Sequence, residues 1–462
     1  MTSLPPAAAL LLEKSLAAGA EQAEVLIKVG AARTVRLDTS GAVHWTRTAE
    51  GGIALRVFLT DGACGFVSAC GPLRDTGSAG SDIGEIAAME TRRLDQIVAA
   101  AMDAARAPGL PLALPAGRAG DGRGLGIFDP RLHTATPADL EGLLSDAAAE
   151  ALKADPRVRR LDACSIAASS SEVMLANSAG LEGSYRQTLT HLSLGVVAGA
   201  SGSRKVFRRS RTSRNLAGFS AALFGDETSR LAVTALEAGA VADGVYPALF
   251  APAAAAEILR AFARTLSPQG APAGAGQTAG SRLLTIIDDG RMPGGIASAP
   301  FDGEGTATRR TTVVSRGGLA GTIHDLASGA RCGAASTGNG IRASFRDPPR
   351  RMPSNFFIAP GSDTPADLMA ELRDGVWIQS LRPAPSIRRA LGEDGELAAL
   401  GTGLRVVDGR PAEAFDGVLV SWPIAELMSG IVGIGNDLTF GFPAGSFGSP
   451  SLLVKEVGLR AS

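Results

Sequence analysis

Residues 22–69 decide the fold class and read QAEVLIKVGAARTVRLDTSGAVHWTRTAEGGIALRVFLTDGACGFVSA. The stretch consists of short apolar and β-branched runs separated by Gly and Asp, which is typical of antiparallel strands joined by tight turns. Glu50-Gly51-Gly52 and Thr60-Asp61-Gly62 carry the residues that hairpin turns favour, so we expect a turn at each. The expected strands are residues 24–29, 34–38, 43–48, 53–59 and 64–69.

Helical patterns flank these strands. Residues 7–18 begin with an apolar run that ends at Glu13-Lys14 and are expected to form a helix, and residues 81–106 place apolar side chains close to a 3.6-residue period. Thr136-Pro137 puts proline at the first position of a helix over residues 138–154. Further along we expect strands at residues 158–167, 172–177 and 187–197, and helices at residues 227–238 and 253–263.

Beyond these helices the chain consists almost entirely of short strands and glycine turns. We therefore predict an α+β fold, in which an N-terminal antiparallel sheet with packed helices is followed by a β-rich C-terminal domain. We place the boundary near Gly225, which gives domains of residues 1–225 and 226–462. Two Pro/Gly-rich stretches, residues 107–126 and 267–280, are expected to be loops.

Composition limits the possible partners. The 462 residues carry 45 Lys+Arg and 46 Asp+Glu, so nothing in the overall charge favours nucleic acid or an anionic membrane. The sequence has no run of about 20 apolar residues, which a membrane-spanning helix would need. Its four cysteines are scattered, and its N-terminus lacks the basic segment of a signal peptide. We expect a cytoplasmic protein.

The histidines do not form a known zinc motif. None of the four is followed by Glu, as the H-E-x-x-H motif of zinc proteases requires. In His324-Asp325, the carboxylate can orient the imidazole as a base. The pair follows a strand-like run, residues 318–323, and neighbouring residues on a strand point to opposite faces. A structural histidine at a strand end is the better interpretation.

Three other segments carry polar groups. Asp288, Asp302 and Glu304 lie among glycines, which suits either a divalent cation or simple turns. Asn339 lies in STGNG, residues 336–340, which is either a phosphate-binding nest or a glycine-dependent turn. Residues 204–214 hold six basic residues in eleven, which suits an acidic partner or a solvated sheet edge.

An ordered series of motifs runs across nearly the whole chain. The central motifs are LTIIDD at 284–289, PFDGEG at 300–305, GTIHDL at 321–326, STGNGIR at 336–342 and PSNF at 353–356. The hairpin-like segment 52–68, the strand 244–250 and the tail 433–454 belong to the same series. Together these segments resemble the TldD/PmbA family, also called TldD/TldE.

The resemblance implies a heterodimer that acts on unstructured peptides, such as leader segments of ribosomally made natural products. In that family the TldD-type subunit carries H-E-x-x-x-H and a distant Cys as zinc ligands, and the TldE or PmbA partner lacks them. Residues 250–259 of this chain, where the motif would lie, read FAPAAAAEIL and contain no histidine. A T-G-D-F-S turn expected between Trp377 and Gly417 is replaced by the different sequence of residues 390–403.

The resemblance thus implies a noncatalytic TldE/PmbA-like subunit without a cofactor of its own, whose TldD-like partner carries zinc. The alternatives are a stand-alone hydrolase or a peptide-binding homodimer with a site around His324, and a nucleic-acid-binding regulator is the weakest hypothesis. No catalytic residue is predicted. The residues expected to contact peptide or partner are Arg204, Lys205, Arg208, Arg209, Asp302, Glu304, His324, Asn339 and Arg342.

Overall fold

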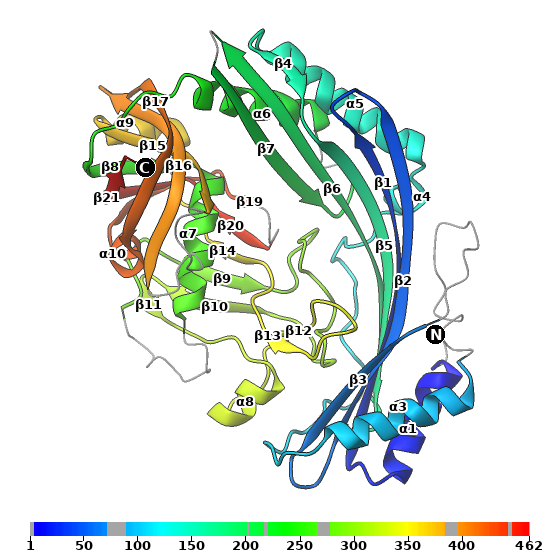
Figure 1. Cartoon of the computed structure of the whole chain (residues 1–462). Coiled ribbons are helices and arrows are strands. Elements are labelled where there is room, and N and C mark those ends of the chain that lie inside the picture. Colours follow the sequence, from blue (N-terminus) through cyan, green and yellow to red (C-terminus); the bar gives the residue numbers. More distant parts are fainter. Residues whose placement is uncertain are drawn as a thin grey trace.

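A large curved sheet and a second, β-rich part face each other across the molecule (Figure 1). The computed structural model describes residues 4–71, 89–200, 203–216, 220–266, 278–383, 395–441 and 446–461. This arrangement confirms the predicted α+β class, with an antiparallel sheet first and a β-rich part after it.

The first sheet has seven antiparallel strands in the order β3-β2-β1-β5-β6-β4, with β7 also paired to β6. Along β1, Val25 and Ile27 face one side and Leu26 faces the other, as the two-residue period of a strand requires. The strands are β1 (Gln22–Leu37), β2 (Val43–Phe58), β3 (Cys64–Cys70), β4 (Val158–Leu161), β5 (Cys164–Asn177), β6 (Glu182–Ala200) and β7 (Ser203–Ser213).

The predicted hairpin at Glu50-Gly51-Gly52 is wrong. β2 runs straight through these residues, and Gly52 pairs with Lys28 in the middle of the β1–β2 ladder. Glycine is needed at position 52 because the ring of Phe345 comes close to the backbone there, and a Cβ on Gly52 would lie 2.1 Å from that ring. The turn at Thr60-Asp61-Gly62 is confirmed, with Gly62 in the left-handed region at φ 78°.

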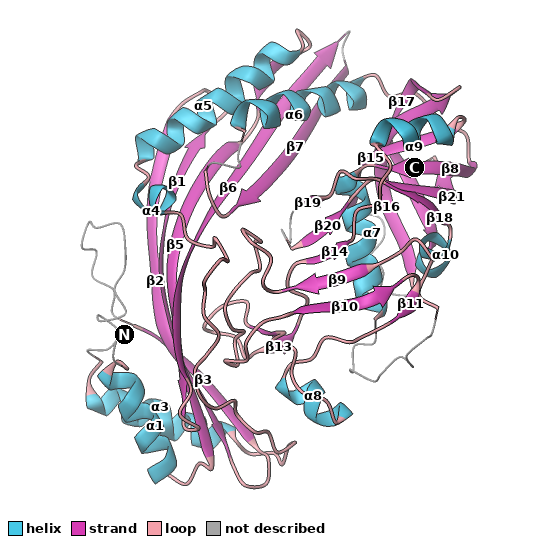
Figure 2. Cartoon of the chain, turned by 180° about the vertical axis from the view of Figure 1, so that it is seen from behind, coloured by secondary structure: helices cyan, strands magenta, loops and turns pink. Residues whose placement is uncertain are grey.

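Helices cover one face of this sheet at both ends (Figure 2). At one end, α1 (Pro6–Ala17) and α3 (Thr91–Ala104) pack on Val25, Ile27 and their neighbours. Residues 81–88 of the longer predicted helix lie outside the described residues. The other end carries α4 (Pro130–Thr134), α5 (Pro137–Ala154) and α6 (Ala221–Leu236).

The helix predicted after Thr136-Pro137 is confirmed as α5. Thr136 and Asp139 form a capping box, in which each side chain accepts a hydrogen bond from the other residue's backbone N–H.

Gly225, the predicted domain boundary, lies inside α6, where a Cβ would come within 2.2 Å of the Ala147 carbonyl of α5. The boundary itself stays a prediction.

The second part packs two six-stranded sheets around α7 (Pro252–Thr265), whose Ile258, Leu259 and Phe262 lie in the shared core. One sheet has the order β11-β10-β9-β14-β20-β19, and the other has the order β17-β16-β15-β8-β21-β18. In the second sheet β17 pairs with both β16 and β21, so five strands form a closed ring. β12 and β13 form a separate two-stranded pair.

The strands of this part are β8 (Gly244–Phe250), β9 (Ile286–Asp289), β10 (Arg310–Ser315), β11 (Gly318–Leu319), β12 (Gly340–Ile341), β13 (Arg350–Arg351), β14 (Phe356–Ile358), β15 (Gly375–Pro383), β16 (Glu396–Val407), β17 (Arg410–Pro423), β18 (Ile431–Ile434), β19 (Thr439–Gly441), β20 (Phe447–Ser449) and β21 (Leu452–Arg460). Its shorter helices are α8 (Leu326–Cys332), α9 (Pro365–Leu372) and α10 (Ile424–Ser429).

The face of the first sheet that the helices leave uncovered receives loops of the second part. Phe301 and Phe345 pack there against Leu26, Val173 and Leu175. The two parts therefore share a buried contact. Among the helices in the described ranges, none is long and apolar enough to cross a bilayer.

Candidate functional site

Buried charged side chains join the first sheet to the loops of the second part. Arg56 of β2 donates hydrogen bonds to Glu24 of β1 at 2.9 Å and to Glu304 at 2.8 Å. Arg342 donates to the other oxygen of Glu24 and, through Nε, to the carbonyl of Gly303 at 2.8 Å. Each of the four side chains is at most 6% exposed. We call Glu24, Arg56, Glu304 and Arg342 the junction network.

Sequence reasoning found only half of this network. Glu304 and Arg342 were among the predicted contact residues, whereas Glu24 and Arg56 were missed. Glu24 and Arg56 lie directly opposite each other in the β1–β2 register and face the second part. The available signal was a charge beside or inside an apolar run in each strand, Glu24 before Val25-Leu26-Ile27 and Arg56 between Leu55 and Val57, because a buried charge needs a partner.

Asp302 and Asp288 hold loops together. Asp302 accepts three backbone N–H bonds, from Gly340, Glu304 and Thr306, at 2.8–3.0 Å. Burial, reinforced by the nearby Glu304, raises the pKa of Asp302 to about 8. Asp288 accepts bonds from Ser354 and from the amide of Asn339, and burial raises its pKa to about 6.

These carboxylates do not converge on one point. Among the residues that the structure describes, no three His, Cys, Asp or Glu side chains form a group that could hold a metal ion. The oxygens of Asp288 and Asp302 are instead occupied by N–H and O–H donors. The turn interpretation accounts for the bonds of Asp302 to Glu304 and Thr306, whereas Asp288, in β9, binds residues of other segments.

Asn339 connects the Asp288 cluster to His324. Its amide donates to Asp288 at 2.7 Å, and its side-chain oxygen accepts from Thr337, whose hydroxyl in turn accepts from the backbone N–H of His324 at 2.7 Å. Gly338, between Thr337 and Asn339, has φ 77°, which confirms the glycine-dependent turn. The structure thus brings five predicted residues, Asp302, Glu304, His324, Asn339 and Arg342, into one region.

His324 and Asp325 do not form a dyad. The strand expected over residues 318–323 is only β11, Gly318–Leu319, and Asp325 is instead the N-cap of α8. The Asp325 carboxylate accepts from the backbone N–H of Ser328 at 2.7 Å, while His324 Nδ1 lies 3.3 Å from the Ser328 hydroxyl. Both residues are buried, so a structural role accounts for their contacts.

We expect His324 to make the fold less stable at acidic pH. Burial, together with Arg351 and Arg309 and against Asp325, lowers the pKa of His324 below its ordinary value of 6.5. The folded state then binds fewer protons than the unfolded state, so stability present above pH 6.5 is lost as the pH falls through the folded pKa. Urea unfolding at about pH 7.5 and about pH 5.5 should therefore show a smaller loss for His324→Gln than for the wild type. An equal loss in His324→Gln would contradict this, and the exposed His44→Gln serves as the control.

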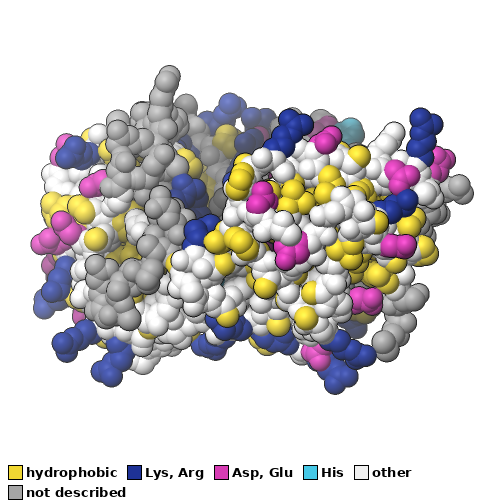
Figure 3. Space-filling view, turned by 90° about the horizontal axis from the view of Figure 1, so that it is seen from below, with side chains coloured by type: hydrophobic (Ala, Val, Ile, Leu, Met, Phe, Trp, Pro, Cys, Tyr) yellow, Lys and Arg dark blue, Asp and Glu magenta, His cyan; other side chains and the backbone are white. Residues whose placement is uncertain are grey.

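Most of the basic stretch at residues 204–214 lies on β7, whereas Arg214, just after β7, is buried and donates to the carbonyls of Gly295 and Ser298. Three of the four predicted contact residues in this stretch are paired within the chain, and Arg204 is exposed. The ion pairs are Lys205–Asp416 at 2.8 Å, Arg208–Asp162 at 2.7 Å and Arg209–Glu227 at 2.9 Å. On the face of the molecule that is seen from below in Figure 3, positive and negative side chains are interspersed.

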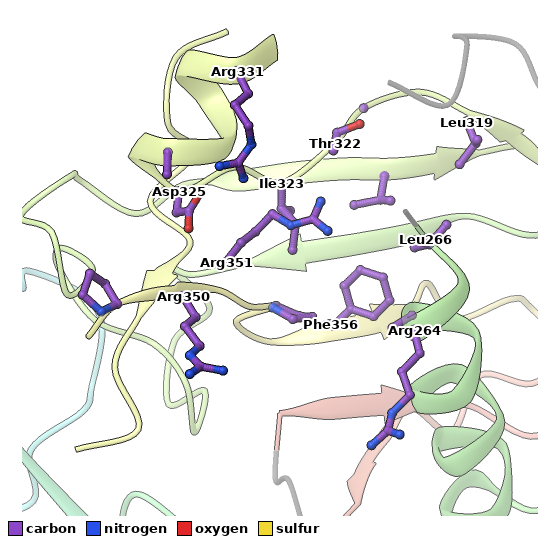
Figure 4. A pocket seen from close by; sticks show the side chains of 16 residues that line it. Arg264, Leu266, Leu319, Thr322, Ile323, Asp325, Arg331, Arg350, Arg351 and Phe356 are labelled. Carbon is purple, nitrogen blue, oxygen red and sulfur yellow. The ribbon is translucent and has the colours of Figure 1, made fainter. Parts of the chain in front are cut away.

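A pocket of about 730 Å³ lies beside α7 and α8 (Figure 4). Its apolar lining includes Leu319, Ile323 and Phe356. Sequence reasoning missed it, because the end of α7 and several short segments between residues 313 and 356 come together only in the folded chain. The charged residues that line it are Arg264, Arg331, Arg350, Arg351 and Asp325.

Comparison with known proteins identifies the class. Residues 130–236 match the model of the PmbA/TldA metallopeptidase central domain, and residues 243–460 match that of the PmbA/TldA metallopeptidase C-terminal domain. Together the two models cover most of the chain. The protein belongs to the PmbA/TldD family.

The curated relatives match in part. The metalloprotease MJ0996 of Methanocaldococcus jannaschii is 32% identical over 107 residues, which are 23% of this chain and 24% of that protein. A metalloprotease of Methanothermobacter thermautotrophicus is 28% identical over 36% of each chain. The chain thus spans about a quarter to a third of the length of these relatives.

Solved structures share the fold over almost the whole length. TldE from Thermococcus kodakarensis has a TM-score of 0.83 and 17% identity, covering 98% of this chain and 100% of that one. A protein of Thermotoga maritima described as a modulator of a DNA gyrase has a TM-score of 0.81 and 18% identity, covering 97% and 98%. At these identities the likeness concerns the fold.

Proposed function

We propose that this chain is a noncatalytic, TldE/PmbA-like subunit of a heterodimeric zinc metallopeptidase. One observation carries the proposal: the chain belongs to a metallopeptidase family, yet residues 250–259, which end β8 and begin α7, contain no histidine. The likeness of its fold to TldE supports the same assignment.

In this proposal a TldD-like partner supplies zinc, the general-base Glu and the metal-bound water, whose pKa the metal lowers. This chain contributes the interface and a wall of the peptide chamber. Unstructured peptides, such as leader segments of ribosomal peptide natural products, are the substrates. An extended peptide binds most simply by adding a strand to a sheet edge, which gives affinity without strong sequence selection.

The stand-alone hydrolase around His324 has less support. Asp325 is occupied by the N-terminus of α8, and Asp302 by three backbone N–H groups, so neither is placed to activate His324. The cytoplasmic location stays a prediction.

We expect the tagged chain to co-purify from its native host with a near-stoichiometric partner that carries H-E-x-x-x-H. The purified pair should cleave an unstructured peptide, and a chelator should abolish the cleavage. The pure chain alone should show no cleavage, because its sequence lacks the zinc motif.

Two results would overturn the proposal. One is chelator-sensitive cleavage by the pure chain. The other is purification from the host as a monomer or homodimer without such a partner. Mixing the separately purified chain with the partner, and measuring cleavage at increasing ratios, tests whether this chain is needed for activity.

A further inference from the structure

The pocket beside α7 and α8 is strongly basic. Four arginines line it and Asp325 is its only acidic residue among the described lining residues. The Asp325 carboxylate already caps α8 through the backbone N–H of Ser328. The pocket therefore holds a clear excess of positive charge in a protein whose overall net charge is −1.

Three of these arginines are available to a ligand. Arg264 is on the last turn of α7, Arg331 is on the last turn of α8, and Arg350 is on β13; all three are exposed. Within the described part of the chain, none of the three has a carboxylate at ion-pair distance. Arg331 and Arg351 extend toward Ile323 from opposite sides of the pocket in Figure 4.

The floor of the pocket is apolar. Val313 of β10 and Phe356 of β14 are buried, and Leu319 and Ile323 complete the surface between the arginines. A ligand that fits this lining needs apolar groups to cover the floor and acidic groups to meet the guanidinium groups.

We propose that this pocket binds an acidic segment of an extended peptide, with its apolar side chains on the floor and its carboxylates on the arginines. The inference rests on the proposed function, because it names the kind of peptide that this subunit recognises. The volume of the pocket, about 730 Å³, is in the range of small-ligand pockets, about 300–1,000 Å³. The pocket therefore holds a few residues of a peptide chain.

The apolar floor favours a peptide over a nucleic acid. Nucleic-acid sites combine many phosphate contacts along an extended basic surface, or aromatic side chains on which bases stack. This pocket has one aromatic residue, Phe356, among its described lining residues, and it is confined in size.

The test is fluorescence anisotropy on the full-length purified chain. The probe is a labelled peptide of alternating Glu and Leu residues, compared with the same peptide in which Gln replaces Glu. We expect the Glu peptide to bind at least about tenfold more tightly, and salt to weaken that binding. The double variant Arg331→Ala/Arg350→Ala should lose about tenfold in affinity for the Glu peptide.

Two further variants test whether binding depends on the charge and the shape of this pocket rather than on the overall charge of the protein. Arg92→Ala/Arg131→Ala removes two exposed arginines from α3 and α4, so it loses the same charge elsewhere and should bind like the wild type. Ala327→Trp, on the α8 wall of the pocket, fills the space without changing charge and should weaken binding. A thermal melt of each variant confirms that it is folded.

Equal binding of the Glu and Gln peptides, or unchanged binding by Arg331→Ala/Arg350→Ala, would overturn the inference. Tighter binding of a single-stranded oligonucleotide of equal charge, lost in the same double variant, would also overturn it. A chain that joins a zinc-bearing partner without preferring the Glu peptide would refute this inference alone. A chain that prefers the Glu peptide but has no partner would refute the proposed function alone.

Discussion

Replacing Arg56 with alanine is expected to lower the free energy of unfolding by about 3–5 kcal/mol. Arg56 is 5% exposed and is held between the carboxylates of Glu24 and Glu304. Its removal leaves Glu304 buried in a low-dielectric environment without its cationic partner, while Arg342 still neutralises Glu24. Urea denaturation monitored by circular dichroism measures the loss.

Two comparisons make this prediction specific. Arg230→Ala removes an exposed ion pair with Asp226 on α6 and should cost less than about 1 kcal/mol. The double variant Arg56→Met/Glu304→Gln removes both charges and keeps an oxygen for the backbone N–H of Leu326, so it should be more stable than Arg56→Ala. A loss below about 1 kcal/mol for Arg56→Ala would contradict the importance of the junction network.

We also expect Gly52→Ala to destabilise the protein by about 1–3 kcal/mol, through overpacking. The new Cβ would lie 2.1 Å from Phe345 and 2.6 Å from the carbonyl oxygen of Ala69. The ring can move, but the carbonyl belongs to β3, which is paired to β2. Thermal and urea unfolding report the change.

The matched control is Gly142→Ala in α5, where no atom outside the adjacent backbone of its own helix lies within 4 Å of the new Cβ. This substitution should stabilise the protein by about 0.5–1 kcal/mol, because alanine favours helix more than glycine does. Phe345→Leu should reduce the cost of Gly52→Ala in a double-mutant cycle. An unchanged free energy of unfolding in Gly52→Ala would show that close packing does not require glycine at this position.

The Glu50-Gly51-Gly52 segment illustrates the limit of local reasoning. Glycine favours turns, but it also allows another group to approach the backbone, and a single strand does not distinguish these cases. Here the approaching group is Phe345, nearly 300 residues away in the chain. The error made one strand of 16 residues appear as two.

The candidate site shows the same limit, because residues that lie close together in the sequence were predicted and their distant partners were not. Asp302, Glu304, His324, Asn339 and Arg342 lie within 41 consecutive residues, and their turn-forming neighbours mark them in the sequence. Their partners Glu24 and Arg56 come from the distant first sheet, and the arginines of the pocket come from α7, α8 and β13, which meet only in the folded chain.

Periodicity, capping residues and short motifs were sufficient to predict the α+β class, the longer helices, the family and the absence of the zinc motif. The buried charge pairs, the need for glycine at position 52 and the pocket lined by four arginines became visible only in the folded chain. Burial and pairing are properties of residues that meet only after folding, because the free energy of a charge or a cavity depends on its surroundings.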